Sequence, residues 1–332
     1  MSKLNKNILI TGVLGQDGSF LAKKLFNKGF NIIGVHKKKI SKNSKKIKNY
    51  LLSECIHISY VTIDLLDIYE TSKLIKKFNP LCIFHLAAIH TSSEEIIEKQ
   101  NKIIQFNVIS TFNLLNSILK INKKIKLINA SSCLIYEHNL SYPQNEFTKC
   151  NPTSPYALSK KASMDLTKYF RDKYHLRVAN AILYNHESYN RSENFFSSKI
   201  IKQIIEIKIK KRKKIIIGNI NEKKDWTDAR DVVDALYLMF KNKNNQDYTI
   251  ASGKIKSIKD FIIIASNIIG VKDIEKKIKI EKKIIKSNKS KTLLIGNSKK
   301  IINNLKWKRS ISFFQMIKDI VDHKLQNEFK LK

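Results

Sequence analysis

Tyr156 and Lys160 lie in the segment Tyr-Ala-Leu-Ser-Lys, which places them four residues apart. On a helix, side chains at this spacing project from the same side, and an ammonium group beside a phenol favours the phenolate. A phenol that exchanges its proton readily is suited to redox chemistry at an alcohol or a ketone. The pair therefore indicates that Tyr156 is a proton-transfer group.

A glycine-rich turn lies far upstream of this pair. The segment Thr11–Ser19 reads Thr-Gly-Val-Leu-Gly-Gln-Asp-Gly-Ser and stands between the apolar run Ile8–Ile10 and a helical pattern. In a strand, glycine turn and helix, bare backbone and the helix N-terminus can approach a pyrophosphate. The spacing here is Gly-x-x-Gly-x-x-Gly rather than Gly-x-Gly-x-x-Gly. We predict a dinucleotide site formed by Gly12, Gly15, Gln16, Asp17 and Gly18.

Strand-like apolar runs alternate with helical patterns through the first half of the chain. This alternation predicts an α/β fold, a Rossmann-type doubly wound parallel sheet that binds ligands at the carboxyl ends of its strands. The predicted strands are Ile8–Ile10, Asn31–Val35, Ile58–Ile63, Leu81–Leu86, Ile125–Ala130 and Val178–Leu183. The predicted helices are Ser19–Lys28, Tyr69–Phe78, Ile103–Ile121 and Pro155–Tyr174.

The second half of the chain is less regular and predicts a smaller, mixed C-terminal substrate-binding lobe. It contains a lysine-rich helical stretch at Phe196–Lys211, a helix start at Asp228–Phe240 and a tail from Ile255. Alternating isoleucine and lysine in Ile274–Lys291 fit a strand or a helix equally. We expect residues 1–184 to form the dinucleotide-binding domain, with 228–250 packing back onto it, and residues 185–227 and 251–332 to form the lobe.

The 332-residue chain carries a formal net charge of +35. Such a charge could attract nucleic acid, but the lysines are spread along the chain without a helix-turn-helix, zinc-finger or aromatic RNA-binding pattern. We therefore expect no specific nucleic-acid partner, while the charge can help to attract a dianionic nucleotide.

The four cysteines are scattered, so neither a metal site nor a disulfide framework is predicted. Cys133 could be a reactive thiol, but we favour a buried, small apolar side chain. No uninterrupted apolar run reaches the ~20 residues that span a bilayer. The N-terminal residues lead directly into the first predicted strand. These features predict a cytoplasmic protein with no membrane partner.

Further motifs give the chain a resemblance to the extended short-chain dehydrogenase/reductases, and most closely to their GDP-mannose 4,6-dehydratase group. Gly-Gln-Asp-Gly-Ser at 15–19 and Asn-His-Glu-Ser at 185–188 look specific to that group, whereas the other matches are shared more widely. Those others are Asp64-Leu65, His85-Leu86-Ala87-Ala88, Pro143-Gln144-Asn145-Glu146, Ser154–Lys160, Lys199-Ile200, Gly218-Asn219 and Asp225-Trp226. The resemblance covers most of the chain and thins after Ala251.

The resemblance implies a nucleotide-sugar substrate, a homodimer or homotetramer, and a catalytic set of Ser132, Tyr156 and Lys160. Ser132 would hydrogen-bond the sugar oxygen at C4, Tyr156 would exchange its proton, and Lys160 would lower the tyrosine pKa and hold the nicotinamide ribose. Further implied cofactor contacts are Asp64, Leu65, Ala87 and Ala88. Implied substrate contacts are Asn185, Glu187, Lys199, Asn219 and Lys224, while His186 reads as a structural hydrogen-bonding residue.

The second predicted strand ends in Val35-His36-Lys37-Lys38-Lys39. An acidic residue at this point usually binds a ribose 2′-hydroxyl, whereas cations accommodate a 2′-phosphate. His36, Lys37 and Lys38 therefore favour NADP over NAD. The alternative is that they are surface residues of a lysine-rich chain.

The chain departs from the group's pattern beside Ser132. Where the group has Ser-Thr-Ser-Glu-Leu-Tyr-Gly, residues 131–137 read Ser-Ser-Cys-Leu-Ile-Tyr-Glu, so Leu134 replaces the glutamate used for dehydration. Leucine cannot transfer a proton, and losing positioned acid–base catalysis costs roughly 10²–10⁴-fold in rate, unless Glu137 or another acid substitutes. Epimerisation is disfavoured because the Cys/His pair of related epimerase-reductases corresponds to Leu134 and Asn190.

Two arginines of the group are also replaced, one by Lys224 and a later one within Ser287–Lys291. Lysine keeps the charge but loses the bidentate fork, so the sugar or the base can differ from GDP-mannose. We therefore favour a 4-keto reductase or C4 dehydrogenase of a nucleotide-linked hexose or heptose, most simply a GDP sugar. The alternative is a 4,6-dehydratase with a displaced acid. A non-catalytic dinucleotide-sensing or polyanion-binding protein would not need the complete set of Ser132, Tyr156 and Lys160.

Overall fold

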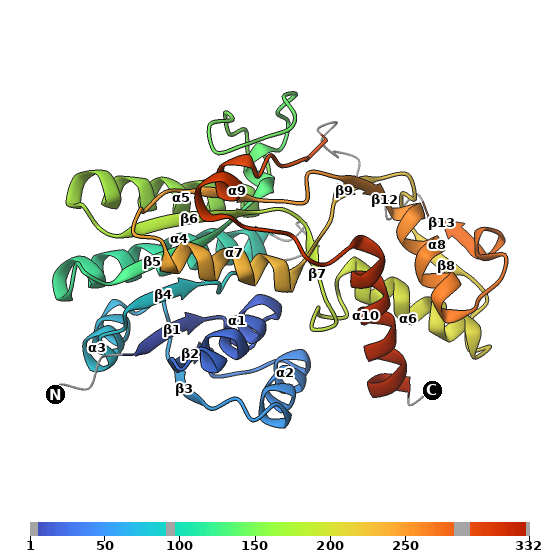
Figure 1. Cartoon of the computed structure of the whole chain (residues 1–332), viewed down its shortest axis with the longest axis horizontal. Helices are drawn as coiled ribbons and strands as arrows, with labels where there is room; N and C mark the ends of the chain where they lie inside the picture. Colours follow the sequence, from blue (N-terminus) through green and yellow to red (C-terminus); the bar gives the residue numbers. More distant parts are fainter. Residues whose placement is uncertain (1–5, 91–96, 282–292, 330–332) are drawn as a thin grey trace.

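The computed structural model describes residues 6–90, 97–281 and 293–329. Within these ranges, a parallel sheet of seven strands has the order β11-β6-β5-β4-β1-β2-β3 (Figure 1). The order reverses between β1 and β4, which is where doubly wound sheets open a crevice for ligands. The strands are β1 (Asn7–Thr11), β2 (Asn31–His36), β3 (Ile58–Thr62), β4 (Cys82–His85), β5 (Lys126–Ser132), β6 (Val178–Leu183) and β11 (Tyr248–Ile250).

The predicted Rossmann-type fold is confirmed, and all six predicted strands lie in this sheet. They are recognisable because parallel strands are buried on both faces and read as continuous runs of isoleucine, leucine and valine. In β1, for example, Ile8 and Ile10 join the core on one face, whereas Leu9 joins the core on the other. The short strand β11 was not predicted.

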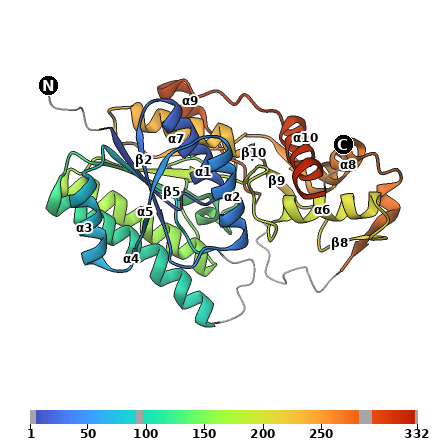
Figure 2. The same ribbon diagram turned by 90° about the horizontal axis from the view of Figure 1, so that it is seen from below.

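Helices cover both faces of the sheet, with α4 and α5 on one side and α7 on the other (Figure 2). The helices of this part are α1 (Gln16–Asn27), α2 (Lys42–Ser53), α3 (Ile68–Phe78), α4 (Ile97–Ile121), α5 (Pro155–Tyr174) and α7 (Ala229–Lys241). Helix α2 escaped prediction because only Ile47 and Leu51 of this lysine-rich segment are buried. None of the helices in the described ranges combines the length and apolar character needed to cross a membrane.

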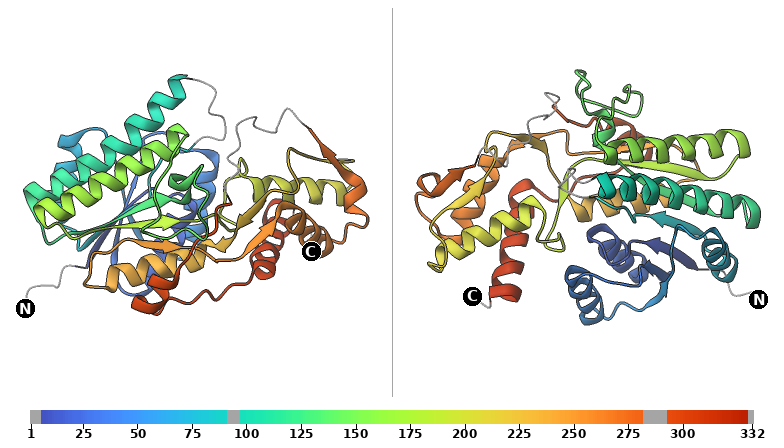
Figure 3. Two further views of the ribbon diagram at one scale, coloured as in Figure 1. Left: turned by 90° about the horizontal axis from the view of Figure 1, so that it is seen from above. Right: turned by 180° about the vertical axis from the view of Figure 1, so that it is seen from behind.

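The remaining elements form a second lobe at the carboxyl end of the sheet (Figures 1 and 3). Its core is made by isoleucines and aromatic residues of α6 (Phe196–Lys208), α8 (Ile258–Ile269) and α10 (Phe313–Lys324). The two-stranded pairs are β8 (Ile215–Ile217) with β13 (Ile278–Ile280), β9 (Lys223–Asp225) with β12 (Ile255–Ser257), and β7 (His186–Glu187) with β10 (Thr227–Asp228).

The segment after Ile255 is therefore not a simple tail, because it carries α8, α9 (Lys299–Leu305) and α10. Of the alternating stretch Ile274–Lys291, Ile274–Lys277 forms a 3-10 turn and Ile278–Ile280 forms β13. Residues 282–291 lie outside the described residues. In sequence, α7 and β11 come between elements of the second lobe, but they pack on the large sheet, where β11 pairs with β6.

Candidate active site

The glycine turn between β1 and α1 leaves no space for side chains. Gly12 has a φ of +72°, and a Cβ at this position would lie 2.9 Å from the main-chain nitrogen of Ala87. A Cβ at Gly18 would lie 2.3 Å from the carbonyl oxygen of Gly12. Gly15 is the N-cap of α1 and offers no side-chain cap to the first turn. Bare backbone and an uncapped helix N-terminus fit a dinucleotide pyrophosphate.

The side chains of this turn contact the segment after β6. Nε2 of His186 lies 2.9 Å from Oδ2 of Asp17, and the hydroxyl of Ser188 donates to Oε1 of Gln16 at 2.8 Å. The amide of Asn190 donates to the hydroxyl of Ser19 at 3.0 Å. The two motifs that look specific to the dehydratase group therefore form one polar network.

His186 is bonded at both ring nitrogens, since its Nδ1 lies 2.7 Å from the carbonyl oxygen of Tyr184. Burial opposes its positive charge, but the Asp17 carboxylate outweighs burial and raises the pKa of His186. Burial of Asp17 acts to raise its pKa, yet His186 and Arg191 together lower it. This geometry supports a charged tether and the structural role expected of His186.

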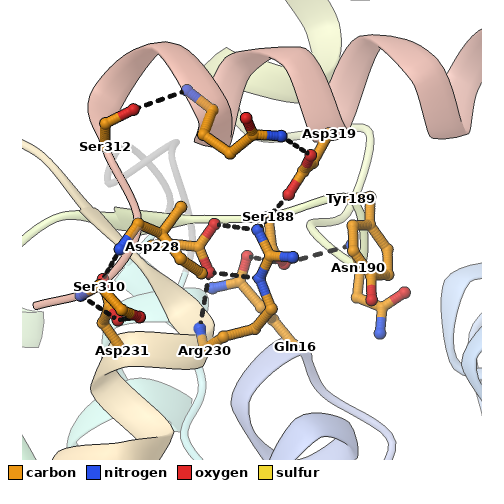
Figure 4. Close-up of polar contacts among 12 residues, drawn as sticks. Gln16, Ser188, Tyr189, Asn190, Asp228, Arg230, Asp231, Ser310, Ser312 and Asp319 are labelled. Atoms are coloured by element: carbon orange, nitrogen blue, oxygen red, sulfur yellow. Dashed lines mark hydrogen bonds and ion pairs between the residues drawn. The ribbon is translucent and has the colours of Figure 1, made fainter.

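A second tether links the C-terminal lobe to the same region (Figure 4). The guanidinium of Arg230 contacts both carboxylate oxygens of Asp228 at 2.8 Å and also reaches Asp319 of α10. Asp231, one residue later, accepts hydrogen bonds from the main-chain and side-chain groups of Ser310. The start of α7 is thus fixed to α10 beside the network of Gln16 and Ser188.

The start of α5, which carries the tyrosine, is held by Glu137. Its carboxylate accepts hydrogen bonds from the main-chain nitrogens of Thr153 at 3.2 Å and Ser154 at 3.0 Å, and from the Ser154 hydroxyl at 3.0 Å. Ser154 is also the N-cap of α5 and accepts from the Ala157 nitrogen. Glu137 therefore fixes the helix turn on which Tyr156 lies.

The structure brings Ser132, Tyr156 and Lys160 together at the carboxyl end of β5. Nζ of Lys160 lies 5.8 Å from the ring centre of Tyr156 and donates to the carbonyl oxygen of Ala130 at 2.8 Å. The hydroxyl of Ser132, at the end of β5, accepts from the Leu134 nitrogen at 3.3 Å. The half-buried Leu134 lies in the 3-10 turn Cys133–Tyr136.

Burial and the nearby Cys133 raise the pKa of Tyr156, and the charge of Arg191 and the Ser132 hydroxyl offset this only in part. Burial also lowers the pKa of Lys160, to about 8. The lowering of the tyrosine pKa by Lys160 stays a prediction, since Nζ of Lys160 donates to the Ala130 carbonyl oxygen here and burial is the largest influence on the phenol. The phenol of Tyr156 therefore keeps its proton at neutral pH. Cys133 is buried, and burial raises its pKa to about 12, which agrees with an unreactive thiol.

The other predicted cofactor contacts follow the strands of this edge. His36 ends β2 and binds the Lys37 carbonyl oxygen through Nδ1 at 2.9 Å, while Lys37 and Lys38 are exposed. Asp64 is exposed and accepts from the Leu66 nitrogen, whereas Leu65 is buried. The Ala87 nitrogen donates to the Thr11 hydroxyl at 3.2 Å, and Ala88 is exposed.

Three of the predicted substrate contacts, Glu187, Asn219 and Lys224, have side chains that interact with other residues of the protein. Glu187 is buried, accepts from the Ser197 hydroxyl and lies 3.4 Å from Nε of Arg191. The Asn219 side chain accepts from the Asn221 nitrogen in its own turn, and Nζ of Lys224 lies 3.5 Å from Glu222. Asn185 is half-buried, and its main-chain carbonyl oxygen accepts from the Thr227 nitrogen. Lys199 is exposed on α6. The predicted arginine replacement at Ser287–Lys291 lies outside the described residues.

Sequence reasoning missed three residues beside Tyr156. The ring of His90 is perpendicular to that of Tyr156, with centres 4.5 Å apart, and it stacks on Phe195. The guanidinium carbon of Arg191 lies 3.7 Å from the centre of the Phe195 ring. The signal for His90 was its place just after the predicted strand Leu81–Leu86, at the edge where such sheets bind ligands.

Curated relatives match this chain over most of its length. A GDP-mannose 4,6 dehydratase from Cricetulus griseus is 31% identical over 78% of this chain and 71% of its own length. One from Dictyostelium discoideum is 29% identical over 97% of this chain and 96% of its own length.

Two solved structures share the fold. A dTDP-glucose 4,6-dehydratase from Bacillus anthracis has a TM-score of 0.83 at 20% identity, covering 98% of both chains. A UDP-glucose 4-epimerase from Thermotoga maritima has a TM-score of 0.82 at 21% identity, covering 96% of this chain and 98% of its own. The family model for GDP-mannose 4,6 dehydratase matches residues 9–320. The chain therefore belongs to the GDP-mannose 4,6-dehydratase family, within the extended short-chain dehydrogenase/reductases.

Proposed function

We propose that this protein transfers a hydride at C4 of a nucleotide sugar, as a 4-keto reductase or C4 dehydrogenase of a GDP-linked hexose or heptose. The proposal rests on Ser132, which ends β5, and on Tyr156 and Lys160 of α5, where Lys160 donates to the Ala130 carbonyl oxygen of β5. We further propose that residues 1–184 with 228–250 bind the dinucleotide, that the rest binds the sugar, and that the enzyme is a homodimer or homotetramer.

In the reducing direction, Tyr156 gives its proton to the oxygen on C4, and Ser132 holds that oxygen by a hydrogen bond. A bound nicotinamide cofactor supplies the hydride that C4 accepts. The protonated phenol, which burial favours, suits this proton donation. Lys160 would hold the nicotinamide ribose.

We favour hydride transfer over dehydration because no free acid is evident beside Ser132 among the described residues. Elimination of water needs a group to remove the C5 proton and an acid to assist loss of the C6 hydroxyl. Leu134 stands where the family has its glutamate, and the nearby Glu137 uses its carboxylate to hold Thr153 and Ser154. A carboxylate committed to the start of α5 is poorly placed to serve as a displaced acid.

For the cofactor, we propose NADP. The support is the cationic end of β2 at His36, Lys37 and Lys38, because cations there accommodate a 2′-phosphate. The solved dTDP-glucose 4,6-dehydratase contains NAD. NAD is therefore the comparison cofactor in every binding measurement.

The second candidate is a 4,6-dehydratase proper, favoured by the names of the relatives from Cricetulus griseus and Dictyostelium discoideum. Purified protein is incubated with GDP-mannose and NADP⁺ in one reaction, and with GDP-4-keto-6-deoxymannose and NADPH in another. Mass spectrometry then identifies the products of each reaction by their mass. Cofactor-dependent reduction of the keto sugar supports the proposal, whereas loss of one water from GDP-mannose contradicts it. If neither cofactor binds and no nucleotide sugar changes the melting temperature, the enzyme class itself is wrong.

A further inference from the structure

The ring of Tyr189 lies against two helices beside the large sheet. Its centre is 5.2 Å from that of Phe20 in α1, with the ring planes at 84°. It is 6.1 Å from the ring centre of Tyr50 in α2, at 74°, and the two phenol oxygens are 3.4 Å apart. Edge-to-face aromatic pairs at these separations attract one another beyond the burial of their surfaces. Tyr189 therefore connects α1 and α2.

The same ring also lies against the second lobe. The imidazole of His323, in α10, stacks on it with ring centres 4.8 Å apart and planes at 16°. The guanidinium carbon of Arg230 lies 5.7 Å from the Tyr189 ring centre. This guanidinium is the one that joins Asp228 to Asp319 of α10 (Figure 4). One half-buried side chain thus contacts helices of both lobes.

The main chain on both sides of Tyr189 is held by the glycine turn and by the helix that follows it. The Ser188 hydroxyl donates to Oε1 of Gln16 at 2.8 Å, and the Asn190 amide donates to the Ser19 hydroxyl at 3.0 Å. Because these two residues flank Tyr189, the position of its ring follows the position of the start of α1. The start of α1 is where we propose that the dinucleotide pyrophosphate binds.

The contact with Tyr50 matters for α2, because this helix has little other buried surface. Of its residues, only Ile47 and Leu51 are buried. Helix α2 follows the cationic end of β2 at residues 36–38, where we propose that the 2′-phosphate of NADP binds. Tyr189 therefore contacts one helix beside each of the two proposed phosphate sites.

We propose that Tyr189 is a positioning residue that couples cofactor binding at the large sheet to nucleotide-sugar binding in the second lobe. A cofactor that fixes the glycine turn and α2 also fixes the Tyr189 ring, and the ring then holds α10 through its stack on His323. Each ligand favours the arrangement of the lobes that the other needs, so each should bind more tightly when the other is present. Linkage requires the two affinities to change by the same factor, and factors of about 5–150 are typical. The inference rests on the proposed function, in which cofactor and sugar bind to different lobes.

The first test uses the cofactor alone. Amide hydrogen exchange of α10 is followed by mass spectrometry with and without NADPH, or NADH if that cofactor binds more tightly. We expect the bound cofactor to slow exchange in Phe313–Lys324 of the unmodified protein, and this protection should be lost in Tyr189→Ala. If cofactor binds to the unmodified protein but leaves the exchange of α10 unchanged, the proposal is overturned, whether or not the variant folds.

The second test measures the coupling itself with NADPH and GDP-mannose, which cannot react because GDP-mannose has no ketone. NADPH is titrated by fluorescence with and without saturating GDP-mannose, and GDP-mannose by calorimetry with and without NADPH. In the unmodified protein, each ligand should raise the affinity of the other by about fivefold or more. This factor should fall toward one in Tyr189→Ala, whereas Tyr189→Phe, which keeps the ring, should retain most of it.

Tyr237→Ala is the matched control. Tyr237 is also half-buried, but its ring contacts Lys24 of α1 and Phe240 of its own helix α7. Its loss should lower the melting temperature without changing the coupling factor. An unchanged factor in Tyr189→Ala would mean that this ring only packs, and would overturn the proposal. If no nucleotide sugar binds, the proposed function fails, and the exchange of α10 with cofactor alone still decides the role of Tyr189.

Discussion

Asp17 and His186 lie 169 positions apart in sequence, yet their side chains form an ion pair of 2.9 Å beside the glycine turn. This contact joins the first helix to the segment that follows β6. Its strength depends on pH, because the pKa of His186 is raised above 6.5 and that of Asp17 is lowered below 3.8.

The first prediction is a stability maximum at mildly acidic pH. The His186 contribution is complete below its unfolded pKa and is lost as pH rises through its raised folded pKa. The Asp17 contribution is present above its unfolded pKa and is lost as pH falls through its lowered folded pKa. Melting temperature should therefore be highest between the two ordinary pKa values and fall on both sides. In Asp17→Asn the decline on the alkaline side should flatten, and an unchanged decline would assign it to other groups.

The second prediction concerns the packing of the glycine turn. In Gly18→Ala the new Cβ would lie 2.3 Å from the Gly12 carbonyl oxygen, so the turn must move. We expect NADPH affinity, measured by fluorescence titration, to fall about tenfold or more, or about 1.4 kcal/mol. Gly29→Ala is the control, because it strains a φ of +79° but meets no atom within 4 Å. Equal effects of both variants on NADPH affinity would argue against a cofactor role for the turn.

The third prediction separates a structural from a catalytic role for Glu137. Glu137→Ala leaves the nitrogens of Thr153 and Ser154 without their acceptor, so the free energy of unfolding should fall by about 1–3 kcal/mol. Chemical denaturation measures this change, and Glu137→Gln, which keeps one acceptor oxygen, should be affected less. A Glu137→Gln protein of normal stability that has lost a dehydration activity would instead identify Glu137 as the displaced acid.

The fourth prediction is that Tyr156→Phe removes turnover while leaving cofactor binding nearly intact. The substitution deletes only the hydroxyl, and the ring can still pack against His90. Steady-state reduction of the keto sugar and NADPH titration test the two parts independently. Unchanged turnover would show that another group exchanges the proton.

The fifth prediction addresses Leu134. This side chain lies in the turn capped by Ser132, so Leu134→Glu places a carboxyl group at the position that the resemblance assigns to the dehydration acid. We expect loss of one water from GDP-mannose to appear, or to rise by roughly 10²-fold, in this variant but not in Leu134→Gln. The absence of dehydration in Leu134→Glu would mean that the site no longer presents C5 and C6 correctly.

Short-range patterns predicted much of the fold. The bounds predicted for the strand Val178–Leu183 and the helix Pro155–Tyr174 are those of β6 and α5, because buried β-branched runs and helical spacing are read from neighbouring residues. Elements with weak local patterns were not predicted, such as the lysine-rich α2 and the three-residue β11. The helices after Ile255 could not be predicted from local patterns, because their isoleucines are buried only where α6, α8 and α10 pack together.

The sequence by itself determined the glycine turn, the spacing of Tyr156 and Lys160, and the presence of a leucine at position 134 close to Ser132, since these are matters of residue type and local order. Only the tertiary structure decided which partner each side chain meets. Asp17 is committed to His186, Glu137 to the start of α5, and the ammonium of Lys160 to Ala130 rather than to the phenol. These partners are brought together by the tertiary packing, which also decides that burial lowers the pKa of Lys160 and that the ion pair raises the pKa of His186.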